Sequence, residues 1–404
     1  MKFINFLKNK NREYKIGIVE EFILMTSACL LCLILGFNLS HKNSNKEEVE
    51  YDENLITFID NYNYIVNNYY KDVNKKQLVD DAIAGMMKTL DDPFSVYMSD
   101  KETKNINIAL NGEYKGLGLM VAKNKDGNIV VVGVFENSAA DKSGILEGDV
   151  IKKVNEKELI DMEPSDFSDY VKKSKDNEFK MTIIREDEEL EITVSKSNVE
   201  IDSVSSKIIE ENNHKIGYIY ISMFAANTEK QFSKKLSELE KQEIESLIID
   251  VREDSGGYLT TVDAILKKFM TKKQIIYQLK KGKKVIKEYG DAKNNRTYKI
   301  VLLGNENSAS ASELLIAGIR ENYDNSIFIG KKTYGKGTAQ EMVSLDANNK
   351  YKITTKKWLT PKGNWINDTK GVIPDIDIDT DEISFGDNEY NDAQLRRAVE
   401  ELAK

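Results

Sequence analysis

The second half of the chain alternates short apolar runs with amphipathic segments, and this alternation constrains the fold most strongly. Buried strands are predicted at 216–221, 247–251 and 300–303, and helices at 228–239 and 311–320. Strands that alternate with helices are typical of α/β proteins, in which helices cover the faces of a mostly parallel sheet. The sequence therefore predicts an α/β core in this half.

The first half of the chain lacks this alternation of strands and helices. The whole chain of 404 residues is long enough for two or three domains. A polar linker at 43–53 precedes two amphipathic helices at about 55–69 and 78–90. Between residues 111 and 199 short β-branched runs replace the helical pattern, for example at 129–134. These shifts predict a helical region followed by a strand-rich domain.

An apolar stretch near the N-terminus predicts a membrane anchor at 16–39. Five Lys and Arg residues lie in the first 15 positions, and no charged residue lies from Phe22 to Phe37. Flanking residues extend this run toward the length of a span, and the basic flank stays in the cytoplasm. A cleaved signal peptide is the alternative, but Gly36-Phe37-Asn38-Leu39-Ser40 is a poor cleavage site. The rest of the chain is therefore expected outside the cytoplasm.

Composition excludes several classes of function. The net charge of −9 argues against nucleic-acid binding, which needs clustered Lys and Arg. The only cysteines, Cys29 and Cys32, lie in the apolar stretch, so no disulfide framework or cysteine metal site is expected. His41 and His214 are the only histidines, and neither suits a zinc motif or a Ser-His-Asp triad. We expect no metal and no organic cofactor.

Glycines in the strand-rich domain indicate a site for a carboxylate. In Tyr114-Lys115-Gly116-Leu117-Gly118-Leu119, the glycines let backbone N–H groups point into one concavity, beside a strand edge that an extended peptide can join. The alternative is that Gly116 and Gly118 only permit a tight turn. Further along lie Ser138-Ala139-Ala140, Gly144-Ile145, Gly148-Asp149-Val150-Ile151 and a predicted hairpin at 179–194.

This ordered set resembles a PDZ domain over most of residues 111–197. The resemblance implies binding of a C-terminal peptide tail at Gly116, Leu117, Gly118 and Leu119. Because Leu117 and Leu119 would line the pocket, the last residue of the tail is expected to be apolar.

Ser310 stands where a predicted strand turns into a helix. Ser308-Ala309-Ser310-Ala311-Ser312-Glu313 follows the turn at 304–307. Such a junction presents a side chain at the top of a sheet and aims free N–H groups of the helix start at the same point. A nucleophile there would have oxyanion donors beside it. The alternative is that Ser310 and Glu313 form only a capping box.

Lys336 is the available base for Ser310, because histidine is scarce. It lies between two glycines in Thr333-Tyr334-Gly335-Lys336-Gly337-Thr338-Ala339-Gln340, although a lysine in such a loop is usually just solvated. With an ordinary pKa near 10.4, the neutral amine costs about 4.6 kcal/mol at pH 7. Burial must therefore lower its pKa. Gln340 is predicted to orient the amine by hydrogen bonding.

A third segment, at 247–257, runs an apolar strand into a polar turn with two glycines. One interpretation is a plain turn between a strand and a helix. The other is that the N–H of Gly256 completes an oxyanion hole with the N–H of Ala311.

Four segments together resemble the carboxyl-terminal processing, or tail-specific, serine proteases. They are D-D-P-F-S-V-Y at 91–97, I-I-D-V-R-E-D-S-G-G at 248–257, S-A-S-A-S-E at 308–313 and T-Y-G-K-G-T-A-Q at 333–340. A fifth, T-P-K-G…G-V-I-P-D at 360–375, also matches, so the resemblance covers about residues 50–380.

The resemblance implies that Ser310 is the nucleophile, Lys336 the general base and Gln340 its orienting partner. Glu313 is expected to help shape the site. The chain departs from the family at Glu253-Asp254-Ser255, where a Gly/Asn-Pro-like stretch is common. The shape of the oxyanion turn is therefore not carried over from the family.

The sequence as a whole predicts a multidomain α+β protein. Its expected parts are a cytoplasmic tail (1–15), a transmembrane anchor (16–39), a linker and N-terminal helical region (40–104), a PDZ domain (105–197), a crotonase-like α/β serine protease core (198–380) and a C-terminal helical segment (381–404). The expected function is a membrane-anchored carboxyl-terminal processing endopeptidase that forms homodimers. An inactive PDZ-containing scaffold is the main alternative, and a thioester-handling hydratase on the same core is a second.

Overall fold

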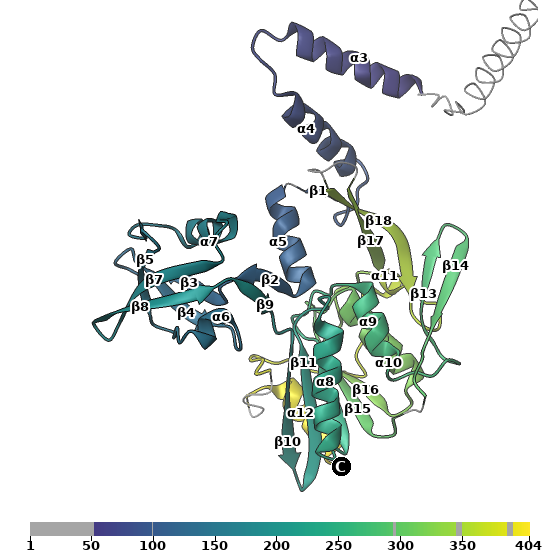
Figure 1. The fold of residues 1–404 in the computed structure, drawn as a ribbon. Coiled ribbons are helices and arrows are strands. Elements are labelled where there is room, and N and C mark those ends of the chain that lie inside the picture. Colours follow the sequence, from purple (N-terminus) through teal and green to yellow (C-terminus); the bar gives the residue numbers. More distant parts are fainter. Residues whose placement is uncertain (1–51, 99, 294–295, 345–349, 386–390) are drawn as a thin grey trace, which may run out of the picture. The chain divides into compact units, whose positions relative to one another are not determined.

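The computed structural model describes residues 52–404 except 99, 294–295, 345–349 and 386–390 (Figure 1). The predicted anchor at 16–39 lies outside the described residues. Within the part that is described, no helix has the length and apolar character needed to cross a bilayer. The chain divides into two compact units, residues 1–81 and 82–404.

The described part of the first unit is helical, as predicted. Helix α3 spans Glu53–Asn68, and α4 spans Lys75–Lys88, so α4 begins in this unit. The Asp52 side chain caps α3 by accepting a hydrogen bond from the N–H of Leu55. No residue of α3 is fully buried, and most of its apolar side chains are exposed.

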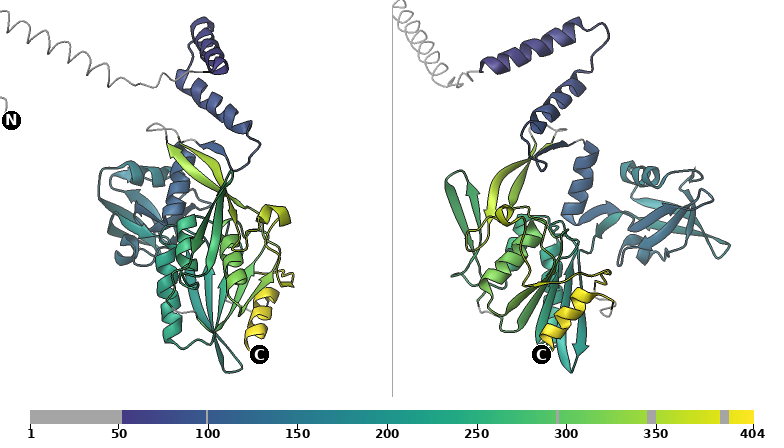
Figure 2. Two further views of the ribbon diagram at one scale, coloured as in Figure 1. Left: turned by 90° about the vertical axis from the view of Figure 1, so that its right-hand side faces the viewer. Right: turned by 180° about the vertical axis from the view of Figure 1, so that it is seen from behind.

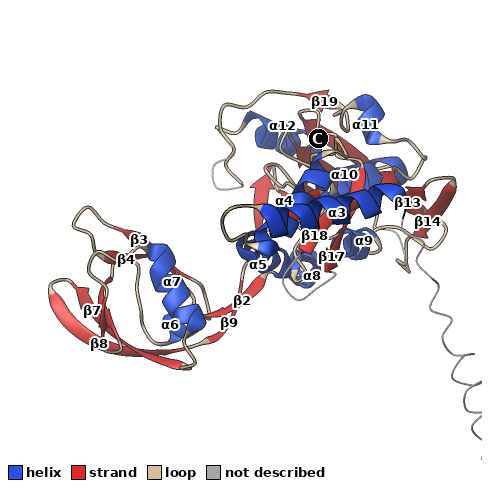
Figure 3. Cartoon of the chain, turned by 90° about the horizontal axis from the view of Figure 1, so that it is seen from above, coloured by secondary structure: helices blue, strands red, loops and turns tan. Residues whose placement is uncertain are grey.

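The strand-rich domain has its own sheet and its own hydrophobic core. Its sheet runs β3-β4-β5-β7-β8, with β6 paired to β5, and α6 and α7 accompany it (Figure 3). The predicted strand at 129–134 and the hairpin at 179–194 are confirmed as β4 and as β7 with β8. The elements are β3 (Leu119–Lys123), β4 (Ile129–Val134), α6 (Ala139–Lys142), β5 (Val150–Val154), β6 (Lys157–Glu158), α7 (Pro164–Lys173), β7 (Glu178–Arg185) and β8 (Glu188–Ser195).

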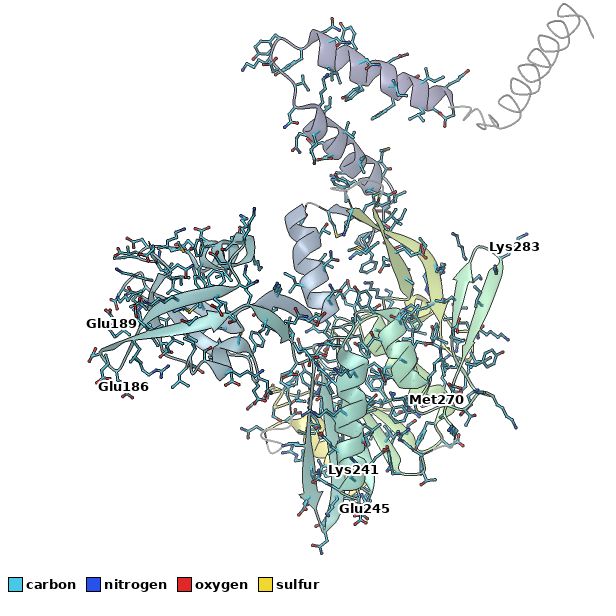
Figure 4. All side chains as sticks on the ribbon, viewed as in Figure 1. Glu186, Glu189, Lys241, Glu245, Met270 and Lys283 are labelled. Carbon is cyan, nitrogen blue, oxygen red and sulfur yellow. The ribbon has the colours of Figure 1, made fainter. Side chains whose placement is uncertain are left out.

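Two features mark the limits of this domain. Strand β2 (Glu113–Gly116) pairs with β9 (Ser197–Glu200), so the chain enters and leaves the domain side by side. At the other end, the β7–β8 hairpin carries the acidic side chains of Glu186 and Glu189, which point away from the sheet (Figure 4).

The α/β core is built on a six-stranded sheet in the order β10-β11-β12-β15-β16-β19. All neighbouring pairs are parallel except β10 with β11. The sequence missed β10, which pairs along its whole length with the strand that follows it. The strands are β10 (Val204–Glu211), β11 (His214–Ile221), β12 (Ser246–Asp250), β15 (Lys299–Gly304), β16 (Ser326–Gly330) and β19 (Ile376–Asp377).

Helices cover both faces of this sheet. Helices α8 (Thr228–Lys241), α9 (Leu259–Leu266) and α10 (Ala311–Asn322) contribute to one apolar cluster with the sheet, and α12 (Ala393–Leu402) contributes to another. Figure 2 shows the C-terminal helix, in yellow, on the face opposite the green helices. Successive residues of β12 alternate between the two clusters, so this strand is buried on both faces.

A second sheet, not predicted from the sequence, runs β1-β18-β13-β14 with β17 paired to β18. Apart from buried residues such as Ile276 and Tyr277 of β13 and Trp358 of β18, these strands are half-exposed or exposed and carry many Lys side chains. Most of them therefore lack the apolar run that marked the core strands. The β13–β14 hairpin ends near Lys283 at the surface (Figure 4). The strands are β1 (Val96–Met98), β13 (Ile275–Lys281), β14 (Lys284–Tyr289), β17 (Thr338–Ser344) and β18 (Lys350–Leu359).

A fully buried arginine ties the C-terminal helix to the core. The Arg252 guanidinium binds the Asp250 carboxylate through Nε and Nη2, and its Nη1 lies 2.8 Å from Asp392 Oδ2. Asp392 also caps α12. Because a buried guanidinium needs all these partners, the contact holds the end of β12 and the start of α12 together.

Candidate active site

Ser310 is the N-cap of α10 and adopts a conformation that few L-residues take. Its φ is 57° and its ψ is −108°. Such backbone strain persists only where surrounding structure holds it, and it is concentrated at functional sites. The preceding turn is held by Ser308, whose Oγ donates to Val251 O at 2.7 Å and accepts from Asn305 N at 2.9 Å.

The buried Glu313 carboxylate joins the serine turn to the lysine loop. It accepts hydrogen bonds from Ser310 N at 2.7 Å and from Lys336 N at 2.9 Å. It also accepts from Thr333 Oγ1 at 2.7 Å and from Gly335 N. The predicted interaction of Glu313 with the helix start is therefore present, and the same carboxylate reaches 23 residues further along the chain. Burial raises the pKa of Glu313, although these four donors oppose the rise.

The Lys336 amine is half-buried, and its pKa is lowered to about 8. Burial is the main cause, and the nearby Lys352 ammonium adds to it, whereas Glu313 and Asp92 oppose it. The loop backbone is held by Trp358, whose Nε1 donates to Lys336 O at 2.9 Å. The amine has the environment that a lysine base requires.

One cavity of about 340 Å³ brings the predicted catalytic and oxyanion residues together. Ser310, Lys336, Gln340, Gly256 and Ala311 all line it. The remaining wall is mostly apolar and includes Leu110, Met223, Leu259, Leu314, Met342 and Trp358. The residues therefore face a space that can admit an apolar side chain of a peptide.

Two of the predicted contacts are not made in this structure. Among the described residues, no hydrogen bond joins Ser310 to the Lys336 amine. Gln340 lies on β17, and its Nε2 donates to Thr338 Oγ1 at 2.9 Å and to Thr354 Oγ1 at 3.0 Å instead of orienting the lysine. The side chains of Ser310, Lys336 and Gln340 thus share a cavity without hydrogen-bonding to one another.

The glycine turn lies directly against Ser310. Gly256 has a φ of 104°, and a Cβ at this position would lie 2.7 Å from Ala309 O and 3.1 Å from Ala311 N. No larger residue fits there. However, Gly256 N already donates to Asp254 Oδ1 at 2.8 Å, so this N–H is not free to bind an oxyanion. The Ala311 N–H lies in the first turn of α10, where no intrahelical acceptor exists.

The residues that depart from the family pattern brace this turn. Asp254 O accepts from Ala309 N at 3.0 Å and from Ser312 Oγ at 2.8 Å. The Glu253 carboxylate accepts from the side chain of Asn305 at 2.6 Å. Burial raises the pKa of Asp254 well above its ordinary value. The buried Asp254 and the exposed Glu253 therefore both bind the serine turn.

Sequence reasoning missed a second turn at this site. Asp92 Oδ1 accepts from Phe94 N at 3.1 Å, and Asp92 Oδ2 accepts from Ser95 Oγ at 2.6 Å. Ser95 Oγ in turn accepts from Thr354 N of β18 at 3.0 Å. The Lys336 amine lies 4.5 Å from the centre of the Phe94 ring. The D-D-P-F-S-V-Y segment, noted only as a family signature, is the signal that could have indicated this contact.

Three of the four predicted tail-binding residues line a separate groove. Gly116, Leu117 and Leu119 line a cavity of about 220 Å³ together with Phe167 and Val171 of α7. Strand β3, which begins at Leu119, is an edge strand of its sheet and lies beside α7 (Figure 3). An extended peptide can therefore add to this edge.

Gly118 does not line this groove. Its φ is 86°, and a Cβ there would lie 2.1 Å from Ser138 Cβ. Its carbonyl accepts a hydrogen bond from Ser138 Oγ at 3.1 Å. Gly118 therefore has the turn-forming role that the sequence left open as an alternative.

No group of three or more His, Cys, Asp or Glu side chains that could hold a metal ion occurs among the described residues.

Models of three known families match this chain. Residues 215–378 match peptidase family S41, residues 106–184 match the PDZ domain, and residues 36–103 match the activating protease CtpB N-terminal domain. Along the chain, the CtpB N-terminal match includes the helical region, the PDZ match lies in the strand-rich domain, and the S41 match lies in the α/β core.

Curated relatives are similar over most of the chain. The carboxy-terminal processing protease CtpB of Bacillus subtilis is 35% identical over 322 residues, which cover 78% of this chain and 66% of the relative. A probable CtpA-like serine protease of Staphylococcus epidermidis is 31% identical over 368 residues, covering 90% and 72%. Among solved structures, a photosystem II D1 C-terminal processing protease aligns with a TM-score of 0.49 at 20% identity, covering 86% of this chain and 97% of that one.

Replacing Lys336 with Met is expected to stabilise the fold at neutral pH. Because the pKa of this lysine is lower in the folded protein than in the unfolded chain, its ammonium penalises folding at every pH below about 8. The penalty fades as the pH rises toward the unfolded value of 10.5. We expect a gain of about 1–3 kcal/mol in the free energy of unfolding at pH 7, measured by urea denaturation, and little gain above pH 10.5.

Lys230→Met is the matched control, because Lys230 is exposed on α8 and lies 3.6 Å from Glu200. It should change stability by less than about 0.5 kcal/mol. Equal stability of the Lys336→Met variant and the original protein at pH 7 would contradict the burial of this amine.

Proposed function

The chain belongs to the carboxy-terminal processing proteases of peptidase family S41, and we propose that Ser310 and Lys336 are its catalytic dyad. Ser310 and Lys336 line one cavity, and their backbone N–H groups share the Glu313 carboxylate. The shared carboxylate is the main support for the proposal, because its hydrogen bonds hold the strained serine and the half-buried lysine next to each other. The proposed core has the crotonase-like arrangement of helices around a mostly parallel sheet.

The proposed reaction is acyl transfer to serine. The neutral Lys336 amine removes the proton from Ser310 Oγ, which attacks the peptide carbonyl and forms a C–O bond. The resulting ammonium then gives its proton to the leaving amine as the C–N bond breaks. Water, deprotonated by the same amine, hydrolyses the acyl-enzyme and restores Ser310.

Backbone N–H groups are proposed to stabilise the oxyanion. The N–H of Ala311 is oriented by the start of α10, and the N–H of Gly256 becomes a second donor when it leaves Asp254 Oδ1. The same rearrangement is proposed to form a hydrogen bond between Ser310 and the Lys336 amine. It also brings the Gln340 side chain into contact with this amine. In this proposal the structure represents a resting arrangement of the site.

Ser310→Ala and Lys336→Ala are each expected to lower cleavage of a tail-bearing protein by at least about 1000-fold, because either change removes the proton transfer that makes the serine nucleophilic. Cleavage is measured by mass spectrometry of the products, and circular dichroism checks the fold. A serine-directed covalent probe should label the original protein and not Ser310→Ala. Absence of labelling and cleavage in the folded original protein would favour an inactive PDZ-containing scaffold.

The groove beside β3 is proposed to bind the C-terminal tail of a protein substrate, with an apolar last residue. Leu119→Asp places a carboxylate in its apolar wall. The KM for a substrate that ends in an apolar residue should rise about tenfold or more, because a buried apolar contact contributes about 1.5–3 kcal/mol. Steady-state kinetics measures the change.

Val132→Asp is the control for this groove, because Val132 is an exposed residue of β4 in the same sheet. Its KM should match that of the original protein. A KM in Leu119→Asp that stays unchanged, or one that rises equally for substrates with charged tails, would exclude tail binding in this groove.

The N-terminal region is proposed to anchor the protein in the cell membrane and to pair two copies. The anchor proposal depends on the apolar sequence at 16–39, and pairing on the exposed apolar side chains of α3. These side chains are Leu55, Ile56, Phe58, Ile59 and Ile65, each more than 40% exposed.

One preparation tests both proposals. Full-length protein is expected to stay with membranes in an alkaline wash and, after extraction with detergent, to have the mass of a dimer by light scattering. Release by the wash would exclude the anchor, and a monomer would exclude pairing through α3.

A further inference from the structure

The Lys336 amine lies over the face of Phe94, which has no part in the mechanism described so far. The distance from Nζ to the ring centre is 4.5 Å, within the range of a cation–π interaction. Within the described residues, Nζ makes no ion pair and no hydrogen bond, so the ring is its specific contact. Phe94 is itself half-buried.

The ring is held in place from several directions. Asp92 fixes the turn through Phe94 N and Ser95 Oγ, and Ser95 Oγ accepts a hydrogen bond from Thr354 N. Thr354 lies opposite Gln340 in the β17–β18 ladder and also accepts from its side chain. Phe94 is thus tied to the strands beside the lysine loop, and its position does not depend on the amine.

The ring has two opposing effects on the amine. By excluding water, it favours the neutral form, whereas the negative face of its π system favours the ammonium. The other charged groups that face the amine are Lys352 on β18, Glu313 on α10 and Asp92 in the turn itself. Tyr258, at the start of α9, also lines the cavity.

We propose that Phe94 is a positioning residue for the general base, whose ring holds the ammonium of Lys336 after it takes the Ser310 proton and until it protonates the leaving amine. This inference rests on the proposed function of Ser310 and Lys336. The inference gives a role to Phe94, a residue of the turn before β1. A serine–lysine dyad does not by itself require such a residue.

Phe94→Leu and Phe94→Ala separate the two effects of the ring. Leu keeps water out but has no π face, so the pH at half-maximal kcat/KM should fall by about half a unit, and the plateau kcat should fall two- to threefold at constant KM. Ala admits water, so the midpoint should rise toward the ordinary lysine value of about 10.4. Phe94→Tyr retains an aromatic face and should keep the midpoint of the original protein.

Substitution of Phe94 by fluorinated phenylalanines provides a test that does not depend on a change of shape. Mono- and trifluorinated rings should lower the midpoint progressively, because fluorine weakens the negative face of the ring. An unchanged or higher midpoint in both Phe94→Leu and the fluorinated series would overturn the proposal. So would a Phe94→Tyr profile that matches Phe94→Leu.

A measurement without catalysis separates this inference from the proposed function. In full-length Ser310→Ala protein, the pH dependence of Lys336 acetylation, followed by peptide mass spectrometry, titrates the amine directly. Adding Phe94→Leu should shift this titration downward by about half a unit. If the original protein cleaves nothing but this shift is found, the function fails and the contact stands; if cleavage occurs without the shift, the contact fails alone.

Tyr170→Leu is the matched control for both measurements. Tyr170 carries a lysine over its ring in the PDZ domain, with Lys157 Nζ 4.8 Å from the ring centre. Its removal should leave the titration of Lys336 unchanged. A shift as large as that in Phe94→Leu would attribute the effect to general destabilisation and would overturn the proposal.

Discussion

One buried carboxylate organises the site. The Glu313 carboxylate accepts hydrogen bonds from the backbone N–H groups of Ser310 and Lys336. These two residues lie in separate loops of the chain. A buried carboxylate is costly unless it is fully hydrogen-bonded, so the two segments must come together to satisfy it. The hydrogen bonds that Glu313 needs in its buried position therefore also hold the Ser310 turn and the Lys336 loop next to each other. In the proposed function, the same capping arrangement at the start of α10 also positions Ser310 for catalysis.

The Lys336 loop connects β16 of the core sheet to β17 of the second sheet, so groups from both sheets surround the lysine. The first sheet supplies the serine through α10, and the second supplies Trp358 and Lys352 from β18. The turn before β1 supplies Phe94. Burial of the amine and, to a lesser extent, repulsion from the Lys352 ammonium lower its pKa to about 8. A lysine in a solvated loop would keep its ordinary pKa and would be a poor base at neutral pH.

The turn at Glu253 and Asp254 shows how a departure from a family pattern can keep the same architecture. Asp254 binds Ala309 and Ser312 through its carbonyl, and its side chain accepts from Gly256. Upstream, Arg252 anchors the same segment to Asp392 at the start of α12. The turn at Glu253 and Asp254 is thus connected to the C-terminal helix, and its position depends on a contact between residues about 140 positions apart.

The local pattern of the sequence was enough to predict the buried strands β11, β12 and β15, because strands buried on both faces are continuous apolar runs. It also predicted the helices α8, α10 and α12, because a helix buried on one face repeats its apolar residues with a helical period. It also singled out Ser310, Lys336, Gln340, Gly256 and Ala311, which the fold brings to one cavity. The sequence did not reveal the second sheet, the contact of Phe94 with Lys336 or the use of the Gly256 N–H by Asp254. All three depend on contacts between different segments of the chain. A local sequence pattern does not show which group from another segment will shield an amine from water or accept a given N–H.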